Sequence, residues 1–174
     1  MTDIAPLAAV LERIRGILGQ ARRQALSAVN AEMLRAYWDI GREIVEEEQR
    51  GERRAEYGTR LLAGLAEQLL SEFGRGFTER NLRFIHEFYQ RFPNWNAVRS
   101  ELSWTHYRLL SRVSSDSARA FYLEECIQAR WSTRDLERQI SSLLYERLAR
   151  SRDREGVMQL AQSGAQAFSR RFSA

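Results

Sequence analysis

Arginine supplies every cationic side chain of this sequence, because its 27 Lys+Arg residues include no lysine. A P-loop is excluded, since its lysine must reach the phosphates of a nucleotide. Schiff-base catalysis and a kinase-type ATP site are excluded for the same reason, and a D…E-x-K nuclease core cannot be assembled from these residues. A codon bias toward arginine explains the missing lysine equally well, so the sequence excludes chemistry more firmly than it assigns any.

One candidate nucleic-acid site begins a helix that follows a glycine-containing turn. A leucine-rich helix over residues 58–73 is followed by a turn at residues 74–77 and a second helix that starts at Thr78. Guanidinium groups pair with guanine and amides with adenine through two hydrogen bonds each, so this helix could read bases. If Leu82 and Ile85 point inward, the exposed residues are Thr78, Arg80, Asn81 and Arg83.

A second helix-turn-helix pattern follows later in the chain. A helix over residues 117–130 leads through Trp131 to a helix that begins at Ser132, where Asp135 completes a capping box with a shorter acid. A helix N-terminus can also accept a phosphate. Two helices with a tight turn are common in ordinary bundles, so packing is the alternative interpretation of both units. The candidate DNA-binding residues of this unit are Ser132 and the outward-facing Arg130, Thr133, Arg134 and Arg138.

The segment over residues 102–108 is rich in aromatic and polar side chains. Tyr107 and Arg108 could stack on bases or bind phosphate. We favour the alternative that Trp104 and Leu109 anchor a short helix in the core while His106 forms local hydrogen bonds.

The sequence offers little for metal or nucleophile chemistry. His86 and His106 are far apart and lack an H-x-x-x-H spacing. Cys126 is the single cysteine, which excludes a disulfide within the chain and a zinc site built on cysteines. There is no G-x-S-x-G elbow, and the run of Glu46, Glu47 and Glu48 is typical of a solvated helix face. We therefore expect no metal, no cofactor and no catalytic residue.

Helical periodicity dominates, and it predicts an all-α, multi-helix bundle with these helix-turn-helix-like units. Beyond the two units, it predicts one helix over residues 104–113 and one over residues 132–150. After Asn30 the apolar phase slips by about one residue, so the N-terminal region is either a helical hairpin or one long, kinked helix. Before that slip, a heptad-like stripe suited to packing against another helix contains Leu7, Leu11, Ile14, Leu18, Ala21 and Ala25.

The positive charge is concentrated in the second part of the chain. Residues 1–78 contain 11 arginines and 12 acids, whereas residues 79–174 contain 16 arginines and 11 acids. The second part is therefore the candidate for contact with a polyanion, and a solvated surface of mixed charge is the alternative. The N-terminus does not resemble a signal peptide, and no segment approaches the roughly 18 apolar residues of a membrane helix. We therefore expect a cytoplasmic protein without membrane contact.

An ordered set of short motifs resembles the YhcG-type proteins, whose N-terminal region is also called the DUF1016 N-terminal domain. The first motif is Tyr37-Trp38-Asp39-Ile40-Gly41-Arg42-Glu43-Ile44, which is similar to the YW-x-I-G-x-x-I element of that family. The resemblance covers roughly residues 10–160, and the order of the motifs makes it specific. Later motifs include Phe73-Gly74-Arg75-Gly76-Phe77, Leu102-Ser103-Trp104-Thr105-His106-Tyr107 and Trp131-Ser132-Thr133-Arg134-Asp135-Leu136.

The resemblance implies an all-helical module that binds DNA in a winged-helix or helix-turn-helix manner. In full-length relatives this module precedes a PD-(D/E)XK nuclease domain, which we do not find in this sequence. We expect a helical domain over residues 1–160, a polar, disordered tail over residues 161–174, and no enzymatic activity of the chain alone. The expected partners are DNA, a PD-(D/E)XK nuclease domain or subunit, and a second copy of the chain. The alternative function is a protein-interaction or dimerisation module.

Overall fold

The computed structural model describes residues 4–50, 56–153, 155 and 158, and it has no β-strand within them. The all-α prediction is therefore confirmed, whereas the expected tail over residues 161–174 lies outside the described residues. None of the described helices is both long enough and apolar enough to cross a membrane. The helices are α1 (Ile4–Arg50), α2 (Glu56–Phe73), α3 (Glu79–Arg91), α4 (Trp104–Ser111), α5 (Asp116–Gln128), α6 (Thr133–Ser141) and α7 (Leu144–Arg150), with short 3₁₀ helices η1 (Arg75–Phe77) and η2 (Trp95–Ala97).

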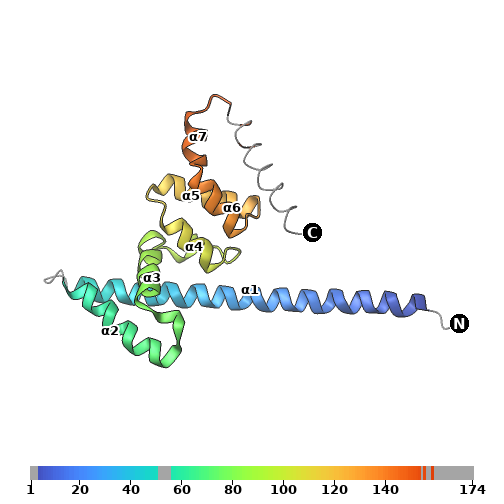
Figure 1. Ribbon diagram of the computed structural model, residues 1–174, viewed down its shortest axis with the longest axis horizontal. Coiled ribbons are helices and arrows are strands. Elements are labelled where there is room, and N and C mark those ends of the chain that lie inside the picture. Colours follow the sequence, from blue (N-terminus) through green and yellow to red (C-terminus); the bar gives the residue numbers. More distant parts are fainter. Residues whose placement is uncertain (1–3, 51–55, 154, 156–157, 159–174) are drawn as a thin grey trace.

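Helix α1 is one continuous helix through Asn30, so the N-terminal region is a long helix and not a hairpin. Figure 1 shows α1 as a rod whose N-terminal half extends beyond the other helices, while α2 and α3 lie against its other end. Asn30 ties the helix to a loop, because its side-chain amide donates to the carbonyls of Ser100 and Leu102 at 3.0 and 2.9 Å. This contact gives the residue a role that requires no break in the helix.

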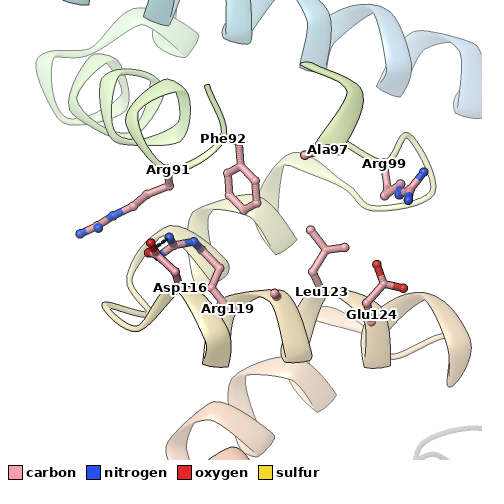
Figure 2. A pocket seen from close by; sticks show the side chains of 9 residues that line it. Arg91, Phe92, Ala97, Arg99, Asp116, Arg119, Leu123 and Glu124 are labelled. Carbon is pink, nitrogen blue, oxygen red and sulfur yellow. Dashed lines mark hydrogen bonds and ion pairs between the residues drawn. The ribbon is translucent and has the colours of Figure 1, made fainter. Parts of the chain in front are cut away.

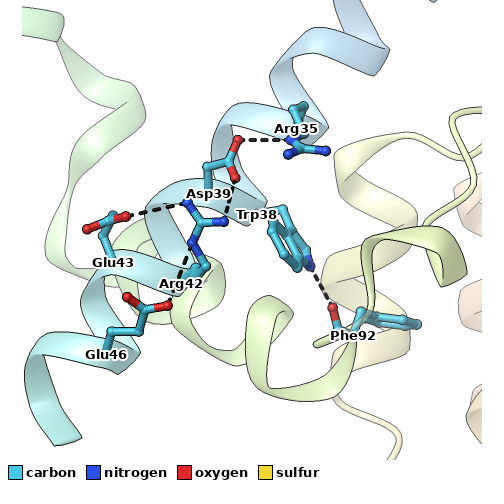
Figure 3. Close-up of polar contacts among 7 residues, drawn as sticks. All are labelled: Arg35, Trp38, Asp39, Arg42, Glu43, Glu46 and Phe92. Atoms are coloured by element: carbon cyan, nitrogen blue, oxygen red, sulfur yellow. Dashed lines mark hydrogen bonds and ion pairs between the residues drawn. The ribbon is translucent and has the colours of Figure 1, made fainter.

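The packed half of α1 crosses α3 closely at Gly41. A Cβ atom on Gly41 would lie 2.6 Å from the carbonyl oxygen of Ile85 and 2.8 Å from the Cβ of Tyr89. One helical turn away, the indole of Trp38 donates a 2.7 Å hydrogen bond to the carbonyl of Phe92, the residue that ends α3 (Figure 3). The first motif of the sequence therefore builds this helix crossing.

Backbone geometry and capping explain how the chain turns from α2 into α3. Gly74 has φ of 81°, a left-handed conformation that glycine adopts without steric cost. Thr78 then caps α3, since its side chain accepts a hydrogen bond from the backbone N–H of Asn81. Leu82 and Ile85 are fully buried, as their spacing predicts.

The helical segment is interrupted between α6 and α7, where the sequence predicts one helix over residues 132–150. Leu143 adopts a left-handed conformation with φ of 53° and is 56% exposed, so the prediction of a single helix is wrong. The break is stabilised by the buried Tyr122 hydroxyl, which donates to the carbonyl of Gln139 at 3.3 Å and accepts from the N–H of Tyr145 at 3.2 Å. Tyr122 thus satisfies backbone groups that a continuous helix would have paired internally.

Candidate nucleic-acid interface

The first predicted unit uses most of its polar side chains to build its own turn. The side-chain amide of Asn81 donates to the carbonyl of Gly76, and the hydroxyl of Thr78 is the helix cap. Arg83 is exposed but pairs with Glu79 at 2.5 Å. Among the four predicted residues, Arg80 is therefore the one that is exposed and has no ion pair with a described residue.

Three arginines gather around the ring of Phe84 on the surface between α3 and α4. The guanidinium carbon of Arg108 lies 4.3 Å from the ring centroid, that of Arg112 lies 5.6 Å away, and that of Arg80 lies 5.8 Å away. Burial, followed by the charges of Arg112 and Arg80, lowers the pKa of Arg108. We call Phe84 and these three arginines the Phe84 cluster.

The structure adds Phe84 and Arg112 to the residues that the sequence predicts for the site. The pairs Arg80 with Phe84 and Arg108 with Arg112 are each four residues apart, which places each pair on one helix face. That spacing is visible in the sequence. The packing of the two faces against each other cannot be seen in the sequence, because it depends on the angle at which α3 meets α4.

The second predicted unit forms a tight turn and a capped helix. Arg130 has φ of 50°, Trp131 is buried, and the hydroxyl of Ser132 lies 2.6 Å from a carboxylate oxygen of Asp135 in a capping box. The predicted capping box is therefore confirmed. The turn presents Arg130 to solvent at the start of α6.

The candidate residues of α6 differ in how strongly they are already engaged. Arg138 donates to Asp135 at 2.9 Å and is partly buried. Thr133 is partly exposed, whereas Arg134 is exposed and forms no ion pair within the described part of the chain. Arg134 is therefore the side chain of α6 that is freest to contact a ligand.

His106 connects α4 to the turn that precedes α6. Its Nδ1 accepts a 3.1 Å hydrogen bond from the N–H of Ser103, and its Nε2 lies 3.1 Å from the carbonyl of Trp131, to which it donates. Burial lowers the pKa of this imidazole, which agrees with a neutral ring. The expectation of local hydrogen bonding at His106 is confirmed, and the contact also reaches across 25 residues of sequence.

Tyr107 is a correction to the predicted site, because its side chain is fully buried. Its ring packs against Phe88 and Phe92 with centroids 4.9 and 5.2 Å apart. Its hydroxyl exchanges hydrogen bonds with the backbone N–H and carbonyl of Arg99, and burial raises its pKa to about 12. Tyr107 therefore holds the core and the 92–102 loop together and does not reach a ligand.

The predicted interface stripe on α1 is exposed to solvent. Leu7 is 69% exposed, Leu11 43%, Ile14 46% and Leu18 53%, and the side chains of Ala21 and Ala25 are also exposed. Within the described residues, no helix covers this half of α1 (Figure 1).

A pocket of about 350 Å³ lies between the end of α3, η2 and α5 (Figure 2). Arg91 and Arg99 line it, but so do the acids Asp116 and Glu124. Arg119, which is buried, pairs with Asp116 and donates to the carbonyl of Val113 at 2.6 Å. This pocket carries its own counter-charges, so we do not assign it to a polyanion.

The described residues include no group of three or more His, Cys, Asp or Glu side chains that could hold a metal ion. Cys126 is buried, and desolvation raises the pKa of its thiol to about 12.

These features define an all-helical module that is built on one long helix and that, within the described residues, carries several arginines without ion pairs on its later helices. The sequence matches the family described as "DUF1016 N-terminal domain" over residues 13–147, and the chain belongs to this family. It is 35% identical over 176 aligned positions to the Escherichia coli (strain K12) protein named "Putative nuclease YhcG". That alignment covers 82% of this chain and 47% of the relative, so the chain spans about half of the relative's length. No solved structure matches the chain.

Proposed function

We propose that this chain is a DNA-binding module of a YhcG-type nuclease system and is non-catalytic by itself. The observation that carries the proposal is the uneven pairing of arginines with acids. On the packed half of α1, Arg35 and Arg42 form ion pairs with carboxylates one turn away or less (Figure 3), and Arg50 pairs in the same way with Glu46 and Glu47. These positive charges are neutralised within the protein.

Five arginines on or next to the later helices are not compensated in this way, in contrast to Arg83, Arg119 and Arg138. No carboxylate of the described residues pairs with Arg80, Arg108, Arg112, Arg130 or Arg134. Positive charges that lack internal partners raise the local potential, which favours a polyanion such as DNA. The relative's name, which describes a nuclease, is consistent with nucleic acid as the partner.

Helix α6 is our candidate for base reading. Its N-terminus is fixed by the capping box and by the His106 contact to Trp131, so Arg134 projects from a positioned element. A guanidinium held in this way can form two hydrogen bonds to guanine in the major groove. Arg138 is held by its hydrogen bond to Asp135, so we assign it to supporting the start of α6 and not to contacting a base.

The proposal is tested by fluorescence anisotropy with a labelled duplex. We expect binding at low salt and a linear fall of log K with log salt concentration, because phosphate contacts release counterions. Absence of binding up to about 100 µM protein at low salt, a range that covers most non-specific binders, would overturn the proposal.

A second candidate function is supported by the exposed half of α1. We propose that it self-associates with another copy of this chain in an antiparallel pair. In that arrangement the leucines near the start of the stripe meet the alanines near its end, for example Leu7 with Ala25 and Leu11 with Ala21. Large residues against small ones allow the two helices to approach closely and fill the space between them.

Light scattering tests this second function. We expect a dimer at high micromolar concentration for the unmodified chain and a monomer for Leu11→Asp, because the charged side chain cannot be buried in the seam. A monomer in both cases would contradict self-association, and binding to an added nuclease domain instead would assign the stripe to that partner.

A further inference from the structure

We propose that the Phe84 cluster is a phosphate-binding site formed by Arg80, Arg108 and Arg112. The inference rests on the proposed function for its natural ligand, a phosphodiester of the DNA backbone. It adds a second contact on α3 and α4, separate from the base-reading side chain on α6. The chemistry that the site recognises is a tetrahedral oxyanion and carries no base preference.

Geometry brings three positive charges to one place from two helices. Arg80 and Phe84 belong to α3, while Arg108 belongs to α4 and Arg112 follows its last residue. All three guanidinium carbons lie within 5.8 Å of one ring centroid. Such a cluster is costly without a counter-ion, because like charges that lie near one another repel.

The partners that would neutralise this cluster are missing from the described residues. No ion pair links Arg80, Arg108 or Arg112 to a carboxylate there, although Arg83, on the same helix, is paired with Glu79. In addition, the Nε atom of Arg108 is buried and has no hydrogen-bond partner in the described structure. An incoming anion would therefore not have to break an existing ion pair.

The ring of Phe84 makes the site more rigid than three free arginines would be. The guanidinium of Arg108 lies over the ring at 4.3 Å, which restrains a side chain that otherwise has many rotamers. A planar guanidinium held in one orientation matches two oxygens of a phosphate. Phosphate therefore fits the cluster better than a spherical anion such as chloride.

The first experiment uses inorganic phosphate as the probe and the whole chain as the protein. Arginine side-chain N–H signals are followed by NMR while sodium phosphate is added at constant ionic strength, with sodium chloride as the control salt. We expect a saturable shift of the Arg108 signal with phosphate and not with chloride. If no arginine of the cluster responds to phosphate, or if chloride produces the same shift, the site is wrong.

The second experiment measures the salt dependence of duplex binding for Arg112→Gln and Arg108→Gln. Each variant removes one charge from the cluster, and we expect the slope of log K against log salt to shrink by about 0.9 for each DNA phosphate that the variant no longer neutralises. Arg22→Gln is the matched control, because it removes one charge from an exposed position on α1. Circular dichroism checks folding, and Arg112→Gln remains informative if Arg108→Gln unfolds, because Arg112 is exposed.

The outcomes separate this inference from the proposed function. If duplex binding is present but both variants keep the slope of the unmodified chain, the phosphate site is wrong and the proposal of DNA binding is supported. If the Arg108 signal responds to phosphate but no duplex binds, the cluster is a site for a free phosphate group and the proposed DNA binding is wrong. An equal decrease of the slope in Arg22→Gln also overturns the site, since the effect would then reflect net charge alone.

Discussion

The Nε2 atom of His106 lies 3.1 Å from the carbonyl oxygen of Trp131, and this contact joins α4 to the turn that opens α6. Helix α4 also supplies Arg108 to the Phe84 cluster. One short helix therefore supports both groups of candidate DNA-binding residues, the cluster through Arg108 and the start of α6 through His106. Changes at His106 should affect stability in a way that depends on pH.

We predict that protonation of His106 destabilises the fold. Because the folded-state pKa is lower than the ordinary value of 6.5, the unfolded chain binds more protons than the folded protein just below that value. Stability is therefore retained above pH 6.5 and falls as the pH drops below it. Urea unfolding near pH 7.5 and near pH 5.5 measures the effect, and in His106→Gln we expect it to be smaller.

The variant His106→Gln also shows which result would contradict this prediction. His106→Gln should lower the free energy of unfolding by roughly 1–3 kcal/mol at neutral pH, because the backbone N–H of Ser103 loses its Nδ1 acceptor, although the glutamine amide can still donate to the carbonyl of Trp131. If the decrease in stability between the two pH values is identical in His106→Gln and in the unmodified chain, His106 does not cause it.

A second prediction concerns the crossing of α1 and α3. Gly41→Ala should destabilise the protein by about 1–3 kcal/mol, because the added Cβ meets the backbone carbonyl of Ile85, which cannot rotate away. Gly16→Ala is the matched control, since no atom lies within 4 Å of its added Cβ. Thermal or urea unfolding measures both variants, and equal stability of the two would contradict the close crossing.

A third prediction concerns the break between α6 and α7. Tyr122→Phe should cost about 1–3 kcal/mol, because the N–H of Tyr145 loses its acceptor in the core and the carbonyl of Gln139 loses this donor while keeping the Ser142 hydroxyl. Tyr145→Phe serves as the control, because its hydroxyl has no hydrogen bond with a described residue. Similar unfolding midpoints for Tyr122→Phe and the unmodified chain would show that the hydroxyl does not stabilise the break.

Local signals in the sequence are sufficient to predict the helices with distinct caps. Thr78, Ser132 and the glycine turn at Gly74 each act within a few residues, so their effects can be recognised without knowing the fold. The break at Leu143 cannot be recognised in this way. It depends on Tyr122, which is distant in sequence and supplies the hydrogen bonds that make the break stable.

The candidate site is predictable in part for the same reason. The exposure of Arg80, Arg130 and Arg134 follows from helix periodicity and is observed. The burial of Tyr107 does not follow from it, because an aromatic residue beside polar ones can face either the core or solvent. The family motif around Trp38 and Gly41 is recognised by resemblance, and the structure accounts for it by helix packing.

The central claim is that unpaired arginines on the later helices bind DNA, and the affinity of Arg134→Gln for a labelled duplex tests it most directly. The matched control is again Arg22→Gln, which removes one charge from an exposed position on α1. We predict that Arg134→Gln binds several-fold more weakly than Arg22→Gln at the same salt concentration, with unchanged helicity. Equal affinities of these two variants, or weaker binding by Arg22→Gln, would contradict the account.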